Sequence, residues 1–268
     1  MDYHVQEHYK ESSGEDPVKG TFHRVIALHE SPNIHWEEVL SYIPNMSRGW
    51  YELCHLSTKD RLDFTRDFWF SKLPYHQNIE NFLENFFSQI DDIGVYITQR
   101  TFDGPYQCQF VYSVQNNGGY YHGELPADDK ALISLSKAFP QVIFPQDFIS
   151  FMQIHNGFSK GDDVGIVRVE KLQVLYKQLQ ELFINREPLF TSKGQIIDPS
   201  RLIPFYSSFG TPNYQCFWEE WYPEQEMGNV YYSEVSKTIS DINAEDDTMA
   251  FPSFSAWLQF YLEMIIEE

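Results

Sequence analysis

The hydrophobic pattern of this chain changes its period once, near residue 90, and that change limits the folds available to it. Between residues 78 and 90 the apolar side chains recur three and four positions apart, which is the spacing of an amphipathic helix. Apolar and polar residues then alternate over 93–98 and again over 106–114, as in strands with one buried face. Asp103-Gly104 between the two runs is typical of a tight hairpin turn. The pattern therefore predicts helices followed by an antiparallel meander, an α+β unit.

The Leu-Pro-Ala-Asp-Asp segment at 125–129 marks the predicted domain boundary. Residues 1–20 are polar and acidic, and we expect them to form a mobile tail. Residues 21–127 form the predicted N-terminal α+β region, which resembles no family. Residues 128–268 form a second predicted α+β domain, in which helices and short strands follow one another.

The same criteria place further elements along the chain. In the N-terminal region we expect a strand at 22–28 and helices at 35–43 and from 57 to Pro74. In the second domain we expect helices at 130–139, 146–155, 170–183 and 254–265, and strands at 164–169, 202–207, 215–218 and 229–232. The Pro- and Gly-containing segment at 185–200 is predicted to be a surface loop.

The charge balance excludes several classes of partner. The chain has 39 Asp and Glu against 19 Lys and Arg, a formal net charge of -20, whereas nucleic acids and anionic membranes attract basic surfaces. No apolar run approaches the roughly 18 residues of a membrane span. Cys54, Cys108 and Cys216 are an odd, sparse set that fits a reducing compartment. We therefore expect a cytoplasmic protein with neither a nucleic-acid nor a membrane partner, and the oligomeric state stays open.

An ordered set of short motifs runs through the second domain. Phe144-Pro145-Gln146-Asp147-Phe148 leads into a predicted helix that ends at His155-Asn156-Gly157, and segments at 203–210, 228–231 and 251–258 follow in a compatible order. This succession resembles the SUKH superfamily, which includes yeast cell-wall-synthesis regulators and bacterial toxin-immunity proteins. The resemblance implies an α+β fold with a mixed, largely antiparallel sheet flanked by helices. It also implies a protein that binds another protein and has no catalytic centre and no cofactor.

Three kinds of residue pattern could carry chemistry, and each also has a structural interpretation. His4-Val5-Gln6-Glu7-His8 formally fits an inverted zinc-peptidase motif, but it lies in the predicted tail without a third ligand. Cys54-His55 could pair a thiol with a base, although sequence neighbours usually point apart. Four acidic pairs lie where capping or solvated acids are ordinary: Asp91-Asp92, Asp128-Asp129, Asp162-Asp163 and Asp246-Asp247. We predict no catalytic residue, no metal and no cofactor.

The candidate binding surface is an acidic, aromatic stretch after the predicted strand at 215–218. Tryptophan and tyrosine are favoured anchors at protein interfaces, and carboxylates around them would attract a basic partner. The alternative is that one tryptophan lies in the core and the acids are merely solvated. The candidate partner-binding residues are Trp218, Glu219, Glu220, Trp221, Tyr222, Glu224 and Glu226, with Asp246 and Asp247 extending the same surface.

These observations predict a non-enzymatic, cytosolic protein-binding protein, either a toxin-immunity or a regulatory module, that captures a basic protein. Two other classes stay open. One is a hydrolase that uses carboxylates or Cys54 in residues 21–127, which would show two titratable groups within hydrogen-bond distance in a pocket. The other is a scaffold or chaperone that holds a client on a large exposed apolar patch.

Overall fold

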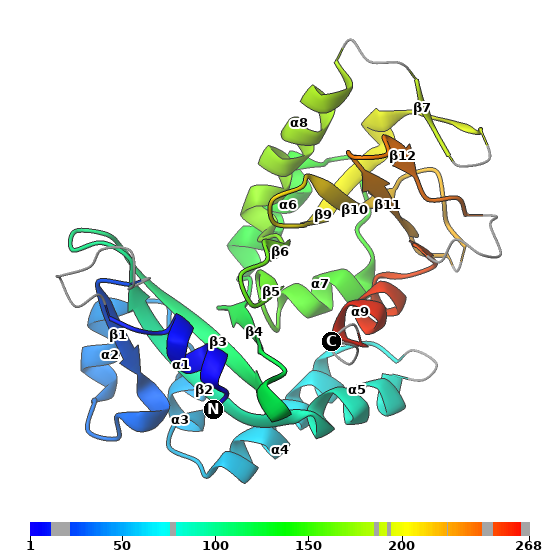
Figure 1. Ribbon diagram of the computed structural model, residues 1–268. Coiled ribbons are helices and arrows are strands. Elements are labelled where there is room, and N and C mark those ends of the chain that lie inside the picture. Colours follow the sequence, from blue (N-terminus) through cyan, green and yellow to red (C-terminus); the bar gives the residue numbers. More distant parts are fainter. Residues whose placement is uncertain are drawn as a thin grey trace. The chain divides into compact units, whose positions relative to one another are not determined.

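Figure 1 shows a computed structural model of the chain, in which the described residues are 1–11, 22–75, 79–184, 188–191, 194–223, 225–242 and 249–263. These residues form two compact units. Unit 1 comprises Met1–Ser71 and Gln77–Leu125, and unit 2 comprises Pro126–Met264 together with Lys72–His76. The division after Leu125 lies close to the boundary predicted after residue 127.

Unit 1 contains the predicted antiparallel meander. Its strands pair in the order β1-β2-β3-β4. Their bounds are β1 (Arg24–Ala27), β2 (Ile90–Gln99), β3 (Tyr106–Val114) and β4 (Tyr120–Glu124). The turn between β2 and β3 is closed by a hydrogen bond from the Gly104 N–H to the Thr101 carbonyl, 2.9 Å. The helix-to-strand change of period near residue 90 is thus the junction between a helix and β2.

Helices cover one face of this meander. They are α2 (Trp36–Tyr42), α3 (Arg48–Leu53), α4 (Thr58–Lys72) and α5 (Ile79–Ser88). Helix α5 buries an aromatic stripe that includes Phe86 and Phe87, and Phe86 lies against Trp69 of α4 and Tyr112 of β3. The Trp69 indole N–H donates to the Tyr112 hydroxyl at 2.9 Å. Two of the largest side chains in this core therefore hydrogen-bond to each other.

The other face of the meander is covered by α1 (Tyr3–His8) and the residues around it. Val5 is 0% exposed, and the Tyr9 ring stacks on Tyr96 of β2 with 4.1 Å between ring centroids. The Asp2 side chain accepts a hydrogen bond from the His4 N–H, 2.6 Å, and caps this helix. The expectation of a mobile tail is therefore wrong for residues 1–11, and residues 12–20 lie outside the described residues.

The physical reason is that β2 to β4 carry apolar side chains on both faces. Tyr96, Val111 and Tyr120 face α1, whereas their strand neighbours Phe110 and Tyr112 face the helices of the opposite layer. A sheet that is apolar on both faces must be covered on both. The polar composition of the first 20 residues concealed the few apolar side chains that provide this cover.

In unit 2 the strands pair antiparallel in the order β5-β6-β9-β10-β11-β12, with β13 also paired to β11. These strands are β5 (Phe158–Lys160), β6 (Gly165–Ile166), β9 (Leu202–Ser207), β10 (Asn213–Trp218), β11 (Asn229–Ser233), β12 (Thr238–Ile239) and β13 (Ala250–Phe251). A separate hairpin joins β7 (Leu189–Phe190) and β8 (Ile196–Ile197), and a parallel bridge joins Thr191 to Ile239.

Helices flank both faces of this sheet, as Figure 1 shows. They are α6 (Asp129–Ala138), α7 (Gln146–Met152), α8 (Leu172–Phe183) and α9 (Phe254–Glu263). Helix α8 packs Leu179 against Cys216 and Val230. On the opposite face, Phe148 of α7 and Phe254 of α9 lie against Phe217 of β10, with ring centroids 5.1 and 6.5 Å away. The predicted α+β class, with helices flanking a largely antiparallel sheet, is confirmed.

Several boundaries differ from the sequence-based expectation. The predicted helix at 146–155 ends at Met152, because the chain turns there toward Gly157, whose φ of 107° is a left-handed value. The strand expected at 164–169 is reduced to β6 and is followed by the short helix η3 (Val169–Lys171). The loop expected at 185–200 contains the β7-β8 hairpin in its described part. Among the described residues, no helix is long and apolar enough to cross a membrane.

Because α1 seals one face of the meander, Val5→Ala should lower the free energy of unfolding by about 1–3 kcal/mol. The loss would come from two buried methyl groups and the cavity that remains. Urea denaturation followed by circular dichroism measures this change. Tyr3→Ala is the matched control, because Tyr3 lies in the same helix and is 59% exposed; it should shift stability by less than about 0.5 kcal/mol. Equal stability of the Val5 variant and the native chain would contradict the packing of α1.

Candidate functional site

The predicted binding stretch forms the connection between β10 and β11, which we call the acidic loop (residues 219–226). Its base is held by the core. Trp218 is 3% exposed and packs in the cluster under α8, and Trp221 packs partly against the same cluster. Three backbone hydrogen bonds frame the turn: Trp218 N–H to the Gly228 carbonyl at 3.0 Å, Trp221 N–H to the Trp218 carbonyl at 3.0 Å, and Gly228 N–H to the Trp221 carbonyl at 2.9 Å. The Trp221 ring lies directly over Gly228, where a β-carbon would clash with it.

Beyond this base, the acidic loop presents carboxylates and a phenol to solvent. The Glu220 side chain is 55% exposed and Tyr222 is 50% exposed. Glu219 is less accessible, and its Oε2 accepts a hydrogen bond from Arg201 Nη1 at 2.9 Å. Arg201 Nε also lies 3.9 Å from Glu220 Oε1. One cation of unit 2 therefore bridges two of the predicted binding residues.

Glu226 has an internal role. Its Oε2 accepts a hydrogen bond from the Gln146 N–H, 3.1 Å, at the first residue of α7. Partial burial raises the pKa of Glu226, and the nearby Asp147 carboxylate raises it further. Glu226 is therefore a helix-capping residue in this structure.

The predicted set thus divides into four groups: surface residues, the two tryptophans at the base of the loop, the capping residue Glu226, and residues outside the described part of the chain. Glu219, Glu220 and Tyr222 lie together on the surface, whereas Trp218 is a core residue and its use as a partner contact is corrected. Strand β10 runs through Trp218 and turns that side chain to the same face as Cys216, which the sequence analysis allowed for as the alternative. Three further predicted residues, Glu224, Asp246 and Asp247, lie outside the described residues.

The residues of the ordered motifs hold unit 2 together. The buried Asp147 accepts hydrogen bonds from two backbone N–H groups: Phe148 at 2.8 Å and Ser255 at 2.7 Å. Because Ser255 lies in the first turn of α9, this one carboxylate fixes the starts of both α7 and α9.

Asn156 has a similar role at the next junction. Its side-chain oxygen accepts from the Val169 N–H at 2.9 Å, and its side-chain nitrogen donates to Glu170 Oε2 at 2.9 Å. Asn229 on β11 donates to the Ser253 carbonyl, also at 2.9 Å, and so ties the sheet to the residue before α9. These polar side chains satisfy backbone groups of unit 2, which is a structural use.

Cys54 and His55 do not form a thiol–imidazole pair. The Cys54 thiol donates to the Trp50 carbonyl at 3.1 Å, and burial raises the pKa of Cys54 to about 12. The His55 ring bonds through Nδ1 to the Tyr51 carbonyl at 2.9 Å. Each side chain is therefore turned to its own helical neighbour four residues earlier, and the thiol is held in its unreactive, protonated form.

The other candidate ligands have structural partners. His4 Nδ1 lies 2.8 Å from Asp2 Oδ1, and the His8 ring packs against Tyr120. Three members of the acidic pairs hold backbone groups or cations: Asp92 pairs with Arg61 at 2.7 Å, Asp128 accepts from the Ala131 N–H at 2.8 Å, and Asp163 accepts from the Phe209 N–H at 2.7 Å. Within the part of the chain that the structure describes, no three His, Cys, Asp or Glu side chains gather as a metal site would require.

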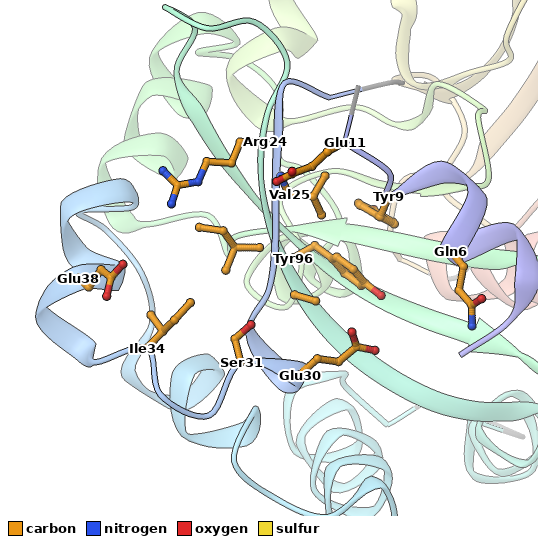
Figure 2. A pocket seen from close by; sticks show the side chains of 12 residues that line it. Gln6, Tyr9, Glu11, Arg24, Val25, Glu30, Ser31, Ile34, Glu38 and Tyr96 are labelled. Atoms are coloured by element: carbon orange, nitrogen blue, oxygen red, sulfur yellow. The ribbon is translucent and has the colours of Figure 1, made fainter. Parts of the chain in front are cut away.

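The sequence analysis missed a pocket of about 650 Å³ in unit 1. Its walls come from the chain around α1, from β1, from η1 (Leu28–Glu30) and the start of α2, and from Tyr96 of β2 (Figure 2). Three carboxylates line it: Glu11, Glu30 and Glu38. Because these residues come from separate segments, one of them in the predicted tail, no local pattern could indicate the pocket.

The burial of the thiols gives a chemical test. All three cysteines are free and buried, and burial raises the pKa of each thiol. In the native protein at pH 8, Ellman's reagent should react with them more than about tenfold slower than in the denatured chain, because the reagent needs an accessible thiolate. Absorbance at the thionitrobenzoate band follows the reaction. A single thiol that reacts rapidly in the native protein would contradict the burial of all three cysteines.

The capping role of Asp147 predicts a large cost for its removal. Asp147→Ala leaves the buried N–H groups of Phe148 and Ser255 without their acceptor and should lower the free energy of unfolding by about 2–4 kcal/mol. Asp129→Ala is the control, since Asp129 is an exposed acid in the first turn of α6 and should cost under about 1 kcal/mol. Chemical denaturation of both variants distinguishes the two. Similar losses for the two variants would argue against a shared cap.

The chain was also compared with known proteins. Comparison with models of protein families finds no match, and a search of curated protein sequences finds none either.

Proposed function

We propose that this protein is a non-enzymatic binding module that acts in the cytoplasm and captures a basic protein through the surface of the acidic loop. The observation that carries this proposal is the construction of the loop. Its base is fixed by Trp218 and Trp221, while Glu220 and Tyr222 project into solvent. A surface held in place before binding loses less conformational entropy when the partner docks.

The net charge of the chain also favours a basic partner. A net charge of -20 gives the chain a negative field that attracts cationic partners over the distances at which diffusion brings them together. Within the acidic loop, Glu219 is already paired with Arg201, at 2.9 Å. A basic partner would exchange that internal cation for its own, and Glu220, which Arg201 approaches only to 3.9 Å, would bind first.

The proposal also draws on the resemblance of residues 128–268 to the SUKH superfamily. We suggest that unit 2 is a module of that kind, used either in toxin immunity or in regulation. Asp147, Asn156 and Asn229 make hydrogen bonds that hold the fold together. This structural role accounts for the motif residues without a catalytic reaction and so supports the suggestion. An immunity module would bind over the active site of a basic toxin.

Association kinetics test the proposal. Proteins captured by the full-length chain from its native cytosol would be identified, and the association rate of a basic candidate would be measured at about 50 and 300 mM salt. We expect the rate to fall about tenfold at the higher salt, because screening weakens electrostatic attraction. Glu220→Gln should lower the rate about twofold at low salt, since it removes an exposed carboxylate from the acidic loop.

Glu181→Gln is the matched control. It removes one exposed carboxylate from α8 of the same unit, so it changes the net charge equally without altering the acidic loop. Equal effects of the two substitutions would mean that only the total charge matters. An association rate that does not change with salt would contradict electrostatic capture altogether.

A further inference from the structure

The pocket of unit 1 has the size of a ligand site and an unusual charge balance. Its volume of about 650 Å³ lies within the range typical of small-molecule pockets, about 300–1,000 Å³. Figure 2 shows Glu11, Glu30 and Glu38 on three different sides of it. The lining therefore surrounds the cavity with carboxylates and does not gather them at one point, as a metal ion would require.

Arg24, the one cation among the described lining residues, forms no direct ion pair with these acids and reaches Glu38 only through Tyr42, whose hydroxyl donates to Glu38 Oε1 at 3.2 Å. The Arg24 guanidinium lies over the Tyr42 ring, 5.2 Å from its centroid, and donates to the hydroxyls of Tyr106 at 3.3 Å and Tyr42 at 3.4 Å. Among the described residues it forms no ion pair with Glu11, Glu30 or Glu38. Figure 2 shows it extending away from Tyr96 and Glu30.

Glu30 is also without a charged partner on its own helix. Among the described residues, its one contact with a basic side chain is with His29, whose Nε2 lies 3.8 Å from Glu30 Oε1. Burial lowers the pKa of His29, so this imidazole is neutral near pH 7 and supplies no charge. The Glu30 side chain, which is 66% exposed, therefore lies at the open edge of the pocket without a charged partner among the described side chains.

Tyr96 provides a second, independent indication of a ligand. Its side chain is 5% exposed, stacked on Tyr9 and packed edge-on against His29. Within the described part of the chain its hydroxyl has no hydrogen-bond partner, and it lines the pocket, so a ligand there could bond to it. Figure 2 shows this hydroxyl pointing into the pocket on the side where Glu30 lies.

We propose that this pocket binds an aliphatic ammonium group, which would donate to the Tyr96 hydroxyl oxygen and pair with Glu30. The neighbouring wall is apolar, from Val25 and Ile26 of β1 and Ile34, and it suits the methylene stem of such a ligand. Glu11 and Glu38 stand on other sides, so a ligand with a second ammonium fits better than a monoamine. Free diamines or polyamines and a lysine side chain share this chemistry. The site lies in unit 1 and does not rest on the function proposed for unit 2.

Titration calorimetry tests the site with defined probes. Cadaverine and spermidine represent free amines, N-acetyl-lysine methylamide represents a lysine side chain, and 1-pentanol and glutarate are the neutral and anionic controls. We expect the amines to bind and the two controls to give no heat of binding. Tighter binding of cadaverine or spermidine identifies a free amine as the ligand, whereas equal or tighter binding of the lysine derivative identifies a protein side chain. Binding of glutarate, or no binding of any amine, would overturn the proposal.

Two variants separate the pocket from the general charge of the chain. Tyr96→Phe keeps the ring stack and removes only the hydroxyl, and it should weaken amine binding about tenfold, the value of one hydrogen bond to a charged group. Its melting temperature should not fall, because the hydroxyl has no partner within the described chain to lose. Glu30→Gln should weaken binding about fivefold.

Glu80→Gln is the control variant. Glu80 is an exposed acid of α5 in the same unit, outside the pocket, so its loss changes the net charge equally. It should bind cadaverine as the native protein does. Equal weakening by Glu30→Gln and Glu80→Gln, together with no effect of Tyr96→Phe, would show that amines only condense on an acidic protein and would overturn the site.

Discussion

The β-strands of both units carry apolar side chains on two faces, and the rest of the structure follows from the need to cover these faces. In unit 1, Val111 of β3 faces the layer of α1, whereas its neighbours Phe110 and Tyr112 face the layer of α2–α5. In unit 2, Cys216 and Phe217 are sequence neighbours that face α8 and α7 with α9, respectively. Every helix that closes such a face removes apolar area from water, and burial of this kind is the main favourable contribution to folding.

The covering helices also determine where polar chemistry can occur. Their ends must be capped, and in unit 2 the motif residues Asp147 and Asn156 perform that task. Conversely, Tyr96 belongs to a face that α1 covers only in part, so its hydroxyl reaches a pocket and has no internal partner among the described residues.

Much of the fold could be predicted from the sequence, because the strongest patterns are local. The aromatic spacing of α5 and the alternation of β2 and β3 are fixed by each element's own periodicity. The cover provided by α1 could not be predicted in the same way, since six residues give too short a window for a helical period. Similarly, the aromatic and acidic residues after residue 217 predicted a binding surface, but only the register of β10 shows that Trp218 faces inward.

One consequence concerns the segment that carries Gln6, Tyr9 and Glu11, which both seals the meander and lines the pocket. A ligand in the pocket would stabilise the closed arrangement of this segment over any locally opened one, by an amount that grows with the logarithm of one plus the ratio of free ligand concentration to Kd. Occupancy and the protection of the underlying backbone amides from hydrogen exchange would then rise together. The first turns of the chain would thereby act as a thermodynamic reporter of what the pocket holds.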